Sequence, residues 1–323
     1  MARFAKEATT AAKNLGSTTT AYTKAALIYE QQGLGAADVT ARSDVTTKVS
    51  NVTGQNADEV SEQLTAIWNG YKVSAAEAEL YIDKVSAVAA TTAADLEELS
   101  QGMGKVASAA NAMGVDIDQL NASLATIISV TRQDANAVGT SLKTIYARMG
   151  DLMVDGEDEF GVKLGDVSSK LKTMGIDILN AQGQMRDMGE VIEEVASKWD
   201  TWTEAQQQAA AVALAGKRQY NNLIALFENW DMYEEAKSTS KGGAGELQKQ
   251  QDIYMESMEA HLNQLKTEAE DLYQTLLDPE GLNPMIDALT EVVGLINNMI
   301  QSLGGGAGLL NTLGAVGVNV FSK

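Results

Sequence analysis

The feature of this sequence that most constrains its fold is the scarcity of proline. The chain of 323 residues contains two prolines, Pro279 and Pro284, and both lie near its end. Proline breaks helices because it lacks a backbone N–H, so long helices can run unbroken through the residues before it. Alanine dominates the apolar fraction and aromatic residues are only 5% of the chain, so the core per residue is thin. We therefore predict an all-α fold, built as an extended helical assembly.

Capping patterns predict where several helices begin. A Ser, Asn or Thr followed three positions later by an acidic residue can satisfy backbone donors at a helix N-terminus in both directions. Three such pairs begin at Asn56, Ser74 and Thr92 and are spaced 18 residues apart. This spacing suits a helix of about a dozen residues followed by a short turn. Apolar stripes lie between the caps, so we predict packed antiparallel helical hairpins in this region.

These patterns divide the chain into six segments. We expect an N-terminal helix over 1–35, a helical-hairpin domain over 36–149, an acidic loop with a small β-hairpin and a central helical hairpin over 150–236, a flexible linker over 237–245, a long helix over 246–278, and an apolar segment over 283–323. The β-hairpin is expected near 176–187, where apolar residues flank a turn. The linker is expected from its composition, KSTSKGGAG, which is typical of flexible connections.

The stretch from Trp199 to Trp230 predicts two helices joined by one break. Thr203 begins a capping box with the glutamine three residues later, and 205–215 consists almost wholly of helix formers. Gly216 is expected to end the first helix, because glycine enters the left-handed conformation at low cost. Apolar residues then recur at helical spacing. Two helices joined so closely should pack on each other as a hairpin.

Residues of this central stretch are our candidates for structural or interaction roles. They are Trp199, Trp202, Gly216, Lys217, Arg218, Tyr220, Asn221, Asn222 and Trp230. The tryptophans fit core packing, and they also fit an interface anchor, since tryptophan is enriched at binding hot spots. The two basic residues that follow the glycine suit the negative end of a helix dipole.

The chain lacks the residues on which many enzyme sites depend. It has no cysteine and a single histidine, His261, which excludes disulfides, cysteine nucleophiles and zinc sites with several histidines. The string AVALAGKR lacks the first glycine and the hydroxyl of a phosphate-binding loop. Asp151–Gly156 resembles the start of a calcium loop, but Met153 and Val162 stand where oxygen ligands are needed. We predict no catalytic residue, no cofactor and no metal site.

Charge distinguishes the body of the chain from its end. The net charge is −20, and an acidic protein releases no counterions on binding duplex DNA, so we predict no specific nucleic-acid binding. Residues 292–322 contain no charged side chain, and a run of this length can span a bilayer. This stretch has three explanations: a membrane-active segment, a helix buried in a self-assembled bundle, or the first part of a longer hydrophobic region.

Several strings resemble phage tail tape measure proteins. A tryptophan followed by an Ala-rich helix and then GKRQYNNLIALFENW is similar to the central region of that family. The resemblance continues upstream through YTKAALIYEQQGLG, VSNVTGQNADEVSEQLTAIWNGY and VGTSLKTIYARMGDL, and downstream through LQKQQDIYMES. It covers roughly Ala21 to Asp278, in the order in which such proteins show these strings.

The resemblance implies a structural protein that fills the tail tube during assembly, sets tail length, and leaves the tail ahead of the DNA to help the genome reach the cell. The implied partners are the tail tube protein, tail assembly chaperones, distal tail or baseplate proteins and further copies of the chain, with host membrane contacted through 292–322. The implied location is the lumen of the tail tube, or the host cytoplasm during assembly. Because the helices here are short, we expect the measuring coil outside these residues and the chain to be a fragment.

Two other functions remain open from the sequence. The uncharged stretch also fits a membrane-active, pore-forming or toxin-like helical protein. Some tape measure proteins resemble cell-wall hydrolases in separate domains, so the chain could belong to a tail-associated hydrolase, although none of its strings matches such a motif.

Overall fold

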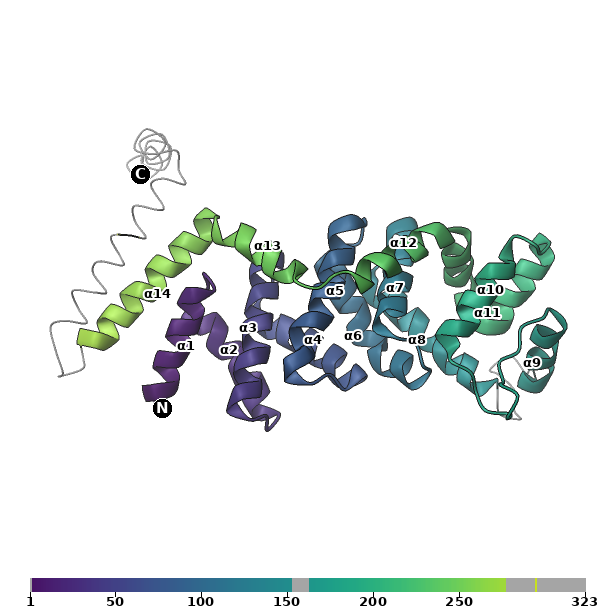
Figure 1. Ribbon diagram of the computed structural model, residues 1–323, viewed down its shortest axis with the longest axis horizontal. Coiled ribbons are helices and arrows are strands. Elements are labelled where there is room, and N and C mark those ends of the chain that lie inside the picture. Colours follow the sequence, from purple (N-terminus) through teal and green to yellow (C-terminus); the bar gives the residue numbers. More distant parts are fainter. Residues whose placement is uncertain (1, 153–162, 277–293, 295–323) are drawn as a thin grey trace, which may run out of the picture. The chain divides into compact units, whose positions relative to one another are not determined.

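The computed structural model describes residues 2–152 and 163–276, together with residue 294. Within these residues it contains fourteen α-helices, one short 3-10 helix and no strand (Figure 1). The all-α prediction is confirmed. By its internal contacts the chain divides into two compact units, one formed by Met1–Ser61 with Leu247–Lys323 and the other by Glu62–Glu246. Each unit is described by itself.

The first unit contains helices from both ends of the described chain. They are α1 (Ala2–Asn14), α2 (Thr19–Gln31), α3 (Ala36–Thr53), the first residues of α4 (Ala57–Tyr71), α13 (Glu246–Met255) and α14 (Met258–Leu276). The single helix expected over 1–35 is interrupted. Gly16 has φ 67, a conformation that glycine adopts more readily than other residues, and Thr18 caps α2 by accepting the Ala21 N–H at 3.2 Å.

Distant side chains satisfy the backbone where α1 ends. The last carbonyls of a helix have no partner within it and need one from elsewhere. The donors here are Asn51 and Gln251 to the Leu15 carbonyl (2.7 and 2.8 Å), Tyr254 to Gly16 (3.1 Å) and Thr267 to Ser17 (2.9 Å). These hydrogen bonds join the beginning of the chain to α3, α13 and α14.

The long helix expected over 246–278 is also divided. Its first part, α13, ends at Met255, and α14 begins at Met258. The Ser257 hydroxyl accepts the Ala260 N–H at 3.1 Å, so this serine caps the second part instead of continuing the first.

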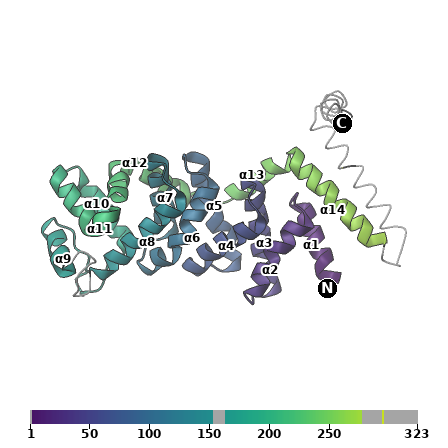
Figure 2. The ribbon, with the colours of Figure 1, turned by 180° about the vertical axis from the view of Figure 1, so that it is seen from behind.

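The second unit is a stack of helices around α7. Its elements are the rest of α4, η1 (Ala75–Glu77), α5 (Ala78–Thr91), α6 (Leu96–Ala112), α7 (Ile117–Thr131), α8 (Ala135–Asp151), α9 (Leu164–Thr173), α10 (Met188–Trp199), α11 (Glu204–Glu228) and α12 (Trp230–Lys241). All residues of α7 from Ile117 to Ile128 are buried. The helix packs against α5, α6, α8, α11 and α12. The two opposite views in Figure 1 and Figure 2 both show α7 among its neighbours.

Local capping explains most helix starts in this unit. Ser74 and Asp116 form the boxes that begin η1 and α7. The cap predicted at Thr92 is wrong: Thr92 lies at the end of α5 and donates to the Val88 carbonyl at 2.9 Å. Asp95 caps α6 instead, because its carboxylate accepts the Glu98 N–H at 2.8 Å and the Glu98 carboxylate accepts the Asp95 N–H at 3.1 Å.

Glycine allows α6 and α8 to approach each other closely. A Cβ atom added to Gly139 would lie 2.2 Å from the Gly102 carbonyl oxygen, and one added to Gly102 would lie 3.0 Å from a methyl group of Leu124. No side chain fits at such distances, so the two backbones are in direct contact at this crossing.

The β-hairpin expected near 176–187 does not form strands. The described residues contain one isolated antiparallel bridge, between Leu179 and Met185, and the Asn180 N–H donates to the Gln184 carbonyl at 2.8 Å. The Arg186 N–H also donates to the Ile178 carbonyl at 3.0 Å, so the segment makes a short antiparallel contact without strands.

The residues expected to form a flexible linker, 237–245, are packed in the second unit. Residues 237–241 complete α12. A Cβ on Gly243 would lie 2.8 Å from the Ala87 Cβ, so the backbone touches α5, and the Gly245 N–H donates to Asp83 Oδ2 at 2.8 Å. Gly243 therefore serves close packing, whereas Gly245 adopts a positive φ of 83.

Three further predictions lie outside the described residues. These concern most of the acidic loop after residue 150, the helix expected from residue 283, and the uncharged stretch 292–322 apart from Gly294. Within the described residues, no helix combines the length and the apolar composition that a bilayer crossing requires.

Candidate functional site

The central stretch folds back on itself at the predicted break. Within α11, Gly216 has φ 70 and ψ 172, which is not helical. In a straight helix, residues twenty positions apart are separated by about 30 Å. Here the Gln207 amide donates to the Trp199 carbonyl at 2.9 Å, and the Phe227 ring lies 4.7 Å from the Trp199 ring. Both halves of α11 therefore reach Trp199, and the break predicted at Gly216 is confirmed.

A continuous run of aromatic rings joins α10, α11 and α12. The centroid distances are 6.4 Å for Trp202 with Trp199, 4.7 Å for Trp199 with Phe227, 6.1 Å for Phe227 with Trp230, and 4.0 Å for Trp230 with Tyr233. We call these five side chains the aromatic run. Trp199 is 4% exposed and serves core packing, whereas Trp202 and Trp230 are half-buried. Core packing therefore accounts for Trp199, while an interface role for Trp202 and Trp230 stays a prediction.

An open groove of about 530 Å³ lies along this run. Its lining residues are Trp199, Asp200, Gln207, Phe227, Glu228, Asn229, Trp230, Asp231 and Met232. We call it the aromatic groove. Three of its side chains are carboxylates. Asp200 directly follows α10, and Glu228 and Asp231 lie at the junction of α11 and α12. Sequence reasoning singled out the tryptophans but not these acids.

A charged cluster closes the other end of the aromatic run. Glu193 Oε1 accepts hydrogen bonds from Lys237 at 2.5 Å, Gln119 at 2.8 Å and the Tyr233 hydroxyl at 3.2 Å. Burial raises the pKa of Glu193, but the hydrogen bonds from Lys237 and Gln119 outweigh it and leave that pKa below its usual value. Burial, and then the nearby Glu193 charge, raise the pKa of Tyr233 far above its usual value. Tyr233 is therefore a protonated donor.

The GKRQYNN string contributes one buried polar anchor. Asn222 is 5% exposed; its amide donates to the Ser141 hydroxyl at 2.7 Å, and its carbonyl accepts from Gln133 at 3.0 Å. It ties α11 to α8. The other candidates of the string are not brought together with it: Lys217, Arg218 and Asn221 are exposed and Tyr220 is half-buried.

A second buried cluster was not predicted. Lys84 donates to both oxygens of Asp118 at 2.8 Å, the Ser240 hydroxyl donates to Asp118 at 2.7 Å, and Asn121 donates to Ser240 at 3.2 Å. It connects α5, α7 and α12. The sequence signal that could have revealed it is the pair Asp118 and Asn121, three residues apart in the otherwise apolar stretch that forms α7. Buried polar groups need partners, so such a pair predicts a polar cluster.

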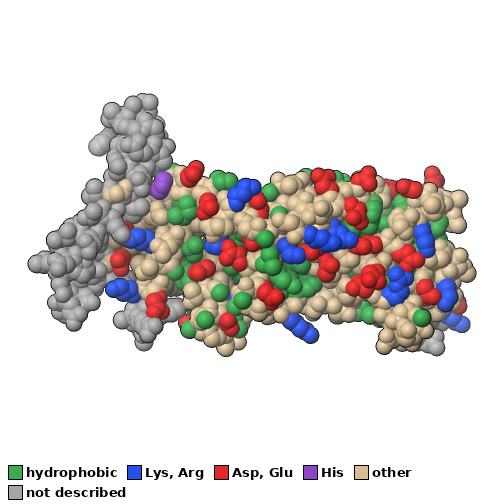
Figure 3. Space-filling model, viewed as in Figure 1, with side chains coloured by type: hydrophobic (Ala, Val, Ile, Leu, Met, Phe, Trp, Pro, Cys, Tyr) green, Lys and Arg blue, Asp and Glu red, His purple; other side chains and the backbone are tan. Residues whose placement is uncertain are grey.

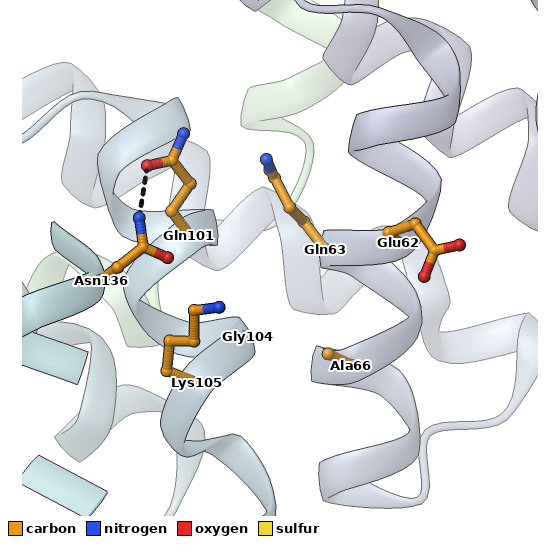
Figure 4. A pocket seen from close by; sticks show the side chains of 7 residues that line it. All are labelled: Glu62, Gln63, Ala66, Gln101, Gly104, Lys105 and Asn136. Atoms are coloured by element: carbon orange, nitrogen blue, oxygen red, sulfur yellow. Dashed lines mark hydrogen bonds between the residues drawn. The ribbon is translucent and has the colours of Figure 1, made fainter. Parts of the chain in front are cut away.

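Two other cavities lie in the second unit. One, of about 350 Å³, is lined mainly by apolar residues of α9 and α11, with Arg148, Lys170 and Lys217 at its edge. Another, of about 340 Å³, lies between α4, α6 and α8. Figure 4 shows Gln101 joined to Asn136 by a hydrogen bond of 3.3 Å, with Glu62, Gln63 and Ala66 on the helix opposite. This cavity is polar and carries one charge of each sign.

The surface and the titratable groups complete the description of the site. On the face drawn in Figure 3, acidic side chains are spread over the surface with basic ones between them, in keeping with the net charge of −20. Within the described ranges, no group of three His, Asp or Glu side chains could hold a metal ion. A partly buried aromatic run, polar ties between helices and an open groove thus characterise this all-α helical protein.

Comparisons with known proteins agree with this class. The chain belongs to the family of phage-related minor tail proteins, whose model matches residues 9–216, more than half of its length. It is similar to the tape measure protein of Pneumococcus phage Dp-1, with 23% identity over 258 residues. That alignment covers 77% of this chain and 21% of the relative, so the chain spans about a fifth of the relative's length. No solved structure matches the chain. The resemblance to tape measure proteins is confirmed.

Proposed function

We propose that this chain is a packed helical module of a tape measure protein, which helps to set tail length during assembly and leaves the tail ahead of the DNA. The observation that carries the proposal is the similarity to a tape measure protein over 77% of the chain, together with the minor tail protein family match. The family is one of structural tail components, and we propose no catalytic role.

Physical properties of the chain fit this function. A helix rises about 1.5 Å per residue, so a helical protein can encode a length in its residue count. The described helices are short, and α11, with 25 residues, is folded in half at Gly216. We therefore assign the measuring part of the protein to residues other than these and regard the second unit as a module for packing or docking.

The proposed location is the lumen of the tail tube. An acidic chain with a net charge of −20 gains nothing from counterion release on DNA, so it would not retain the genome that follows it through the tube. The proposed partners are the tube protein, the assembly chaperones, the distal tail proteins and further copies of the chain. Membrane contact through 292–322 stays a prediction from the sequence.

An in-frame deletion of 62–246, which corresponds to the second unit, tests the function in a phage that carries this gene. If these residues were an extended helix, the tail would shorten by on the order of 280 Å. We expect a smaller change in length, fewer assembled tails and reduced infectivity, all measured by electron microscopy and plaque counts. The intact protein supplied in trans should restore tail length, the number of assembled tails and infectivity. Tails of normal yield, length and infectivity would contradict the proposal.

A further inference from the structure

We propose that the aromatic groove is the docking site for a basic segment of another tail protein, which places an arginine side chain between the aromatic rings and the three carboxylates. No partner chain is needed to form the groove, because α10, α11, α12 and the residues that directly follow α10 and α11, all in the second unit, supply its lining. Calling the partner a tail protein rests on the proposed function; its basic character rests on the chemistry of the groove.

The rings provide the first half of this chemistry. Trp199, Phe227 and Trp230 line the groove and lie in sequence along the aromatic run. The ring face of tryptophan carries negative electrostatic potential and attracts a guanidinium placed over it. Trp230 is half-buried, so part of its surface is accessible to such a side chain.

The carboxylates provide the second half. Asp200, Glu228 and Asp231 are exposed and line the same groove, while the described lining contains no Lys or Arg. Among the residues that the structure describes, none of these three side chains forms an ion pair or a side-chain hydrogen bond. All three carboxylates line the same groove, so a cationic side chain that entered it would find carboxylate oxygens to pair with.

The same run of rings already holds one cation of this kind. Lys237 Nζ lies 5.8 Å from the centroid of the Tyr233 ring and pairs with Glu193 at 2.5 Å. Tyr233 stacks on Trp230 with a centroid distance of 4.0 Å. A ring, a carboxylate and a cation are thus combined at the inner end of the run. The groove presents carboxylates beside the three middle rings of the run, Trp199, Phe227 and Trp230, and the cation there would come from the partner.

Charge complementarity selects this occupant over an apolar or acidic one. An acidic segment would be repelled by the three carboxylates. A purely apolar segment would leave these charges without partners and partly desolvated. Arginine is preferred to lysine because its planar guanidinium stacks on an aromatic ring while its N–H groups bind a carboxylate.

The test is a titration of the whole chain with a short peptide, acetyl-Gly-Arg-Gly-Arg-Gly-amide, followed by calorimetry and by tryptophan fluorescence. The matched probe replaces arginine by citrulline, which has a similar shape and no charge. The variant Asp200→Asn/Glu228→Gln/Asp231→Asn removes the groove carboxylates. The control variant Glu190→Gln/Glu234→Gln/Glu235→Gln removes the same number of exposed charges from α10 and α12 without touching the groove lining.

We expect the arginine peptide to bind the native chain at least tenfold more tightly than the citrulline peptide. The groove variant should weaken binding at least fivefold, and the control variant by less than twofold. Circular dichroism and thermal midpoints show whether each variant folds; if the triple variant does not, Glu228→Gln alone should weaken binding measurably.

Three results would overturn the proposal. They are equal binding of the two peptides, equal binding by the native chain and the groove variant, and no binding at all. A self-association of the native chain that the groove variant abolishes, measured by sedimentation, would identify a second copy as the occupant and would also overturn it. None of these results bears on tail length or infectivity, so the proposed function would be unaffected.

Discussion

At the scale of the residue, Gly216 combines φ 70 with ψ 172, a region of backbone conformation that is essentially confined to glycine. The turn of the central hairpin therefore depends on this one residue. Replacing it by alanine should cost about 1–3 kcal/mol of folding free energy, because the backbone must stay strained or the two halves of α11 must separate.

Urea unfolding of Gly216→Ala, followed by circular dichroism, measures this cost. Tryptophan fluorescence reports on the same change, since Trp199 touches both halves of the hairpin. A variant as stable as the native chain would show that the fold-back does not need glycine.

Glu193 gives a pH dependence with a definite sign. Its pKa is lowered in the folded chain, so its contribution to stability is present above the unfolded value of about 4.3 and is lost as the pH falls through the lower folded value. Glu193→Gln should therefore reduce stability at pH 7, by about 1 kcal/mol or less. The difference from the native chain should shrink steadily below about pH 4.

Thermal midpoints of both chains between pH 3 and pH 7 check this sign. The control is Glu190→Gln, an exposed carboxylate on the same helix. If the difference in thermal midpoint between the native chain and Glu193→Gln widened towards acid pH, the lowered pKa assigned to Glu193 would be refuted.

At the scale of the element, the crossing of α6 and α8 offers a matched pair of glycines. Gly139→Ala places a Cβ 2.2 Å from the Gly102 carbonyl oxygen, so the helices must move apart, and we expect a loss of about 2–3 kcal/mol. Gly104 also lies in α6, but a Cβ there meets its nearest neighbour at 3.7 Å. Gly104→Ala should therefore stabilise by about 0.5–1 kcal/mol through helix propensity. Shifts of the denaturant midpoint in opposite directions for the two variants, each relative to the native chain, would verify the crossing. Equal shifts would disprove it.

At the scale of the whole molecule, the two compact units predict different responses to truncation. The first unit is built from both ends of the described chain, whereas the second is continuous in sequence. A chain that ends at Glu246 would lose the donors that α13 and α14 supply to residues 15–17. The Leu15 carbonyl would keep its hydrogen bond from Asn51, but Gly16 and Ser17 would lose their side-chain donors and α1 would lose its packing against α14. Hydrogen exchange should therefore accelerate within 2–61 and stay unchanged within 62–246; equal protection of 2–61 in both chains would contradict this division.

Local signals were sufficient for much of the fold. The cap at Ser74 and the break at Gly216 follow from interactions that reach only three or four residues along the chain, and such interactions are visible in the sequence. The tryptophans of the central stretch were also recognisable, as were the strings that resemble tape measure proteins.

Other features depend on residues far apart in the sequence. Gln251 donates to the Leu15 carbonyl across 236 positions. This hydrogen bond lies at the break between α1 and α2, where the helix expected over 1–35 is interrupted. Gly243 looked like part of a flexible linker, but it lies against α5. The aromatic groove needs the end of α10 beside the α11–α12 junction. Helix starts are set by neighbouring backbone groups, whereas these features arise from the close packing of distant segments, for which composition and periodicity carry no signal.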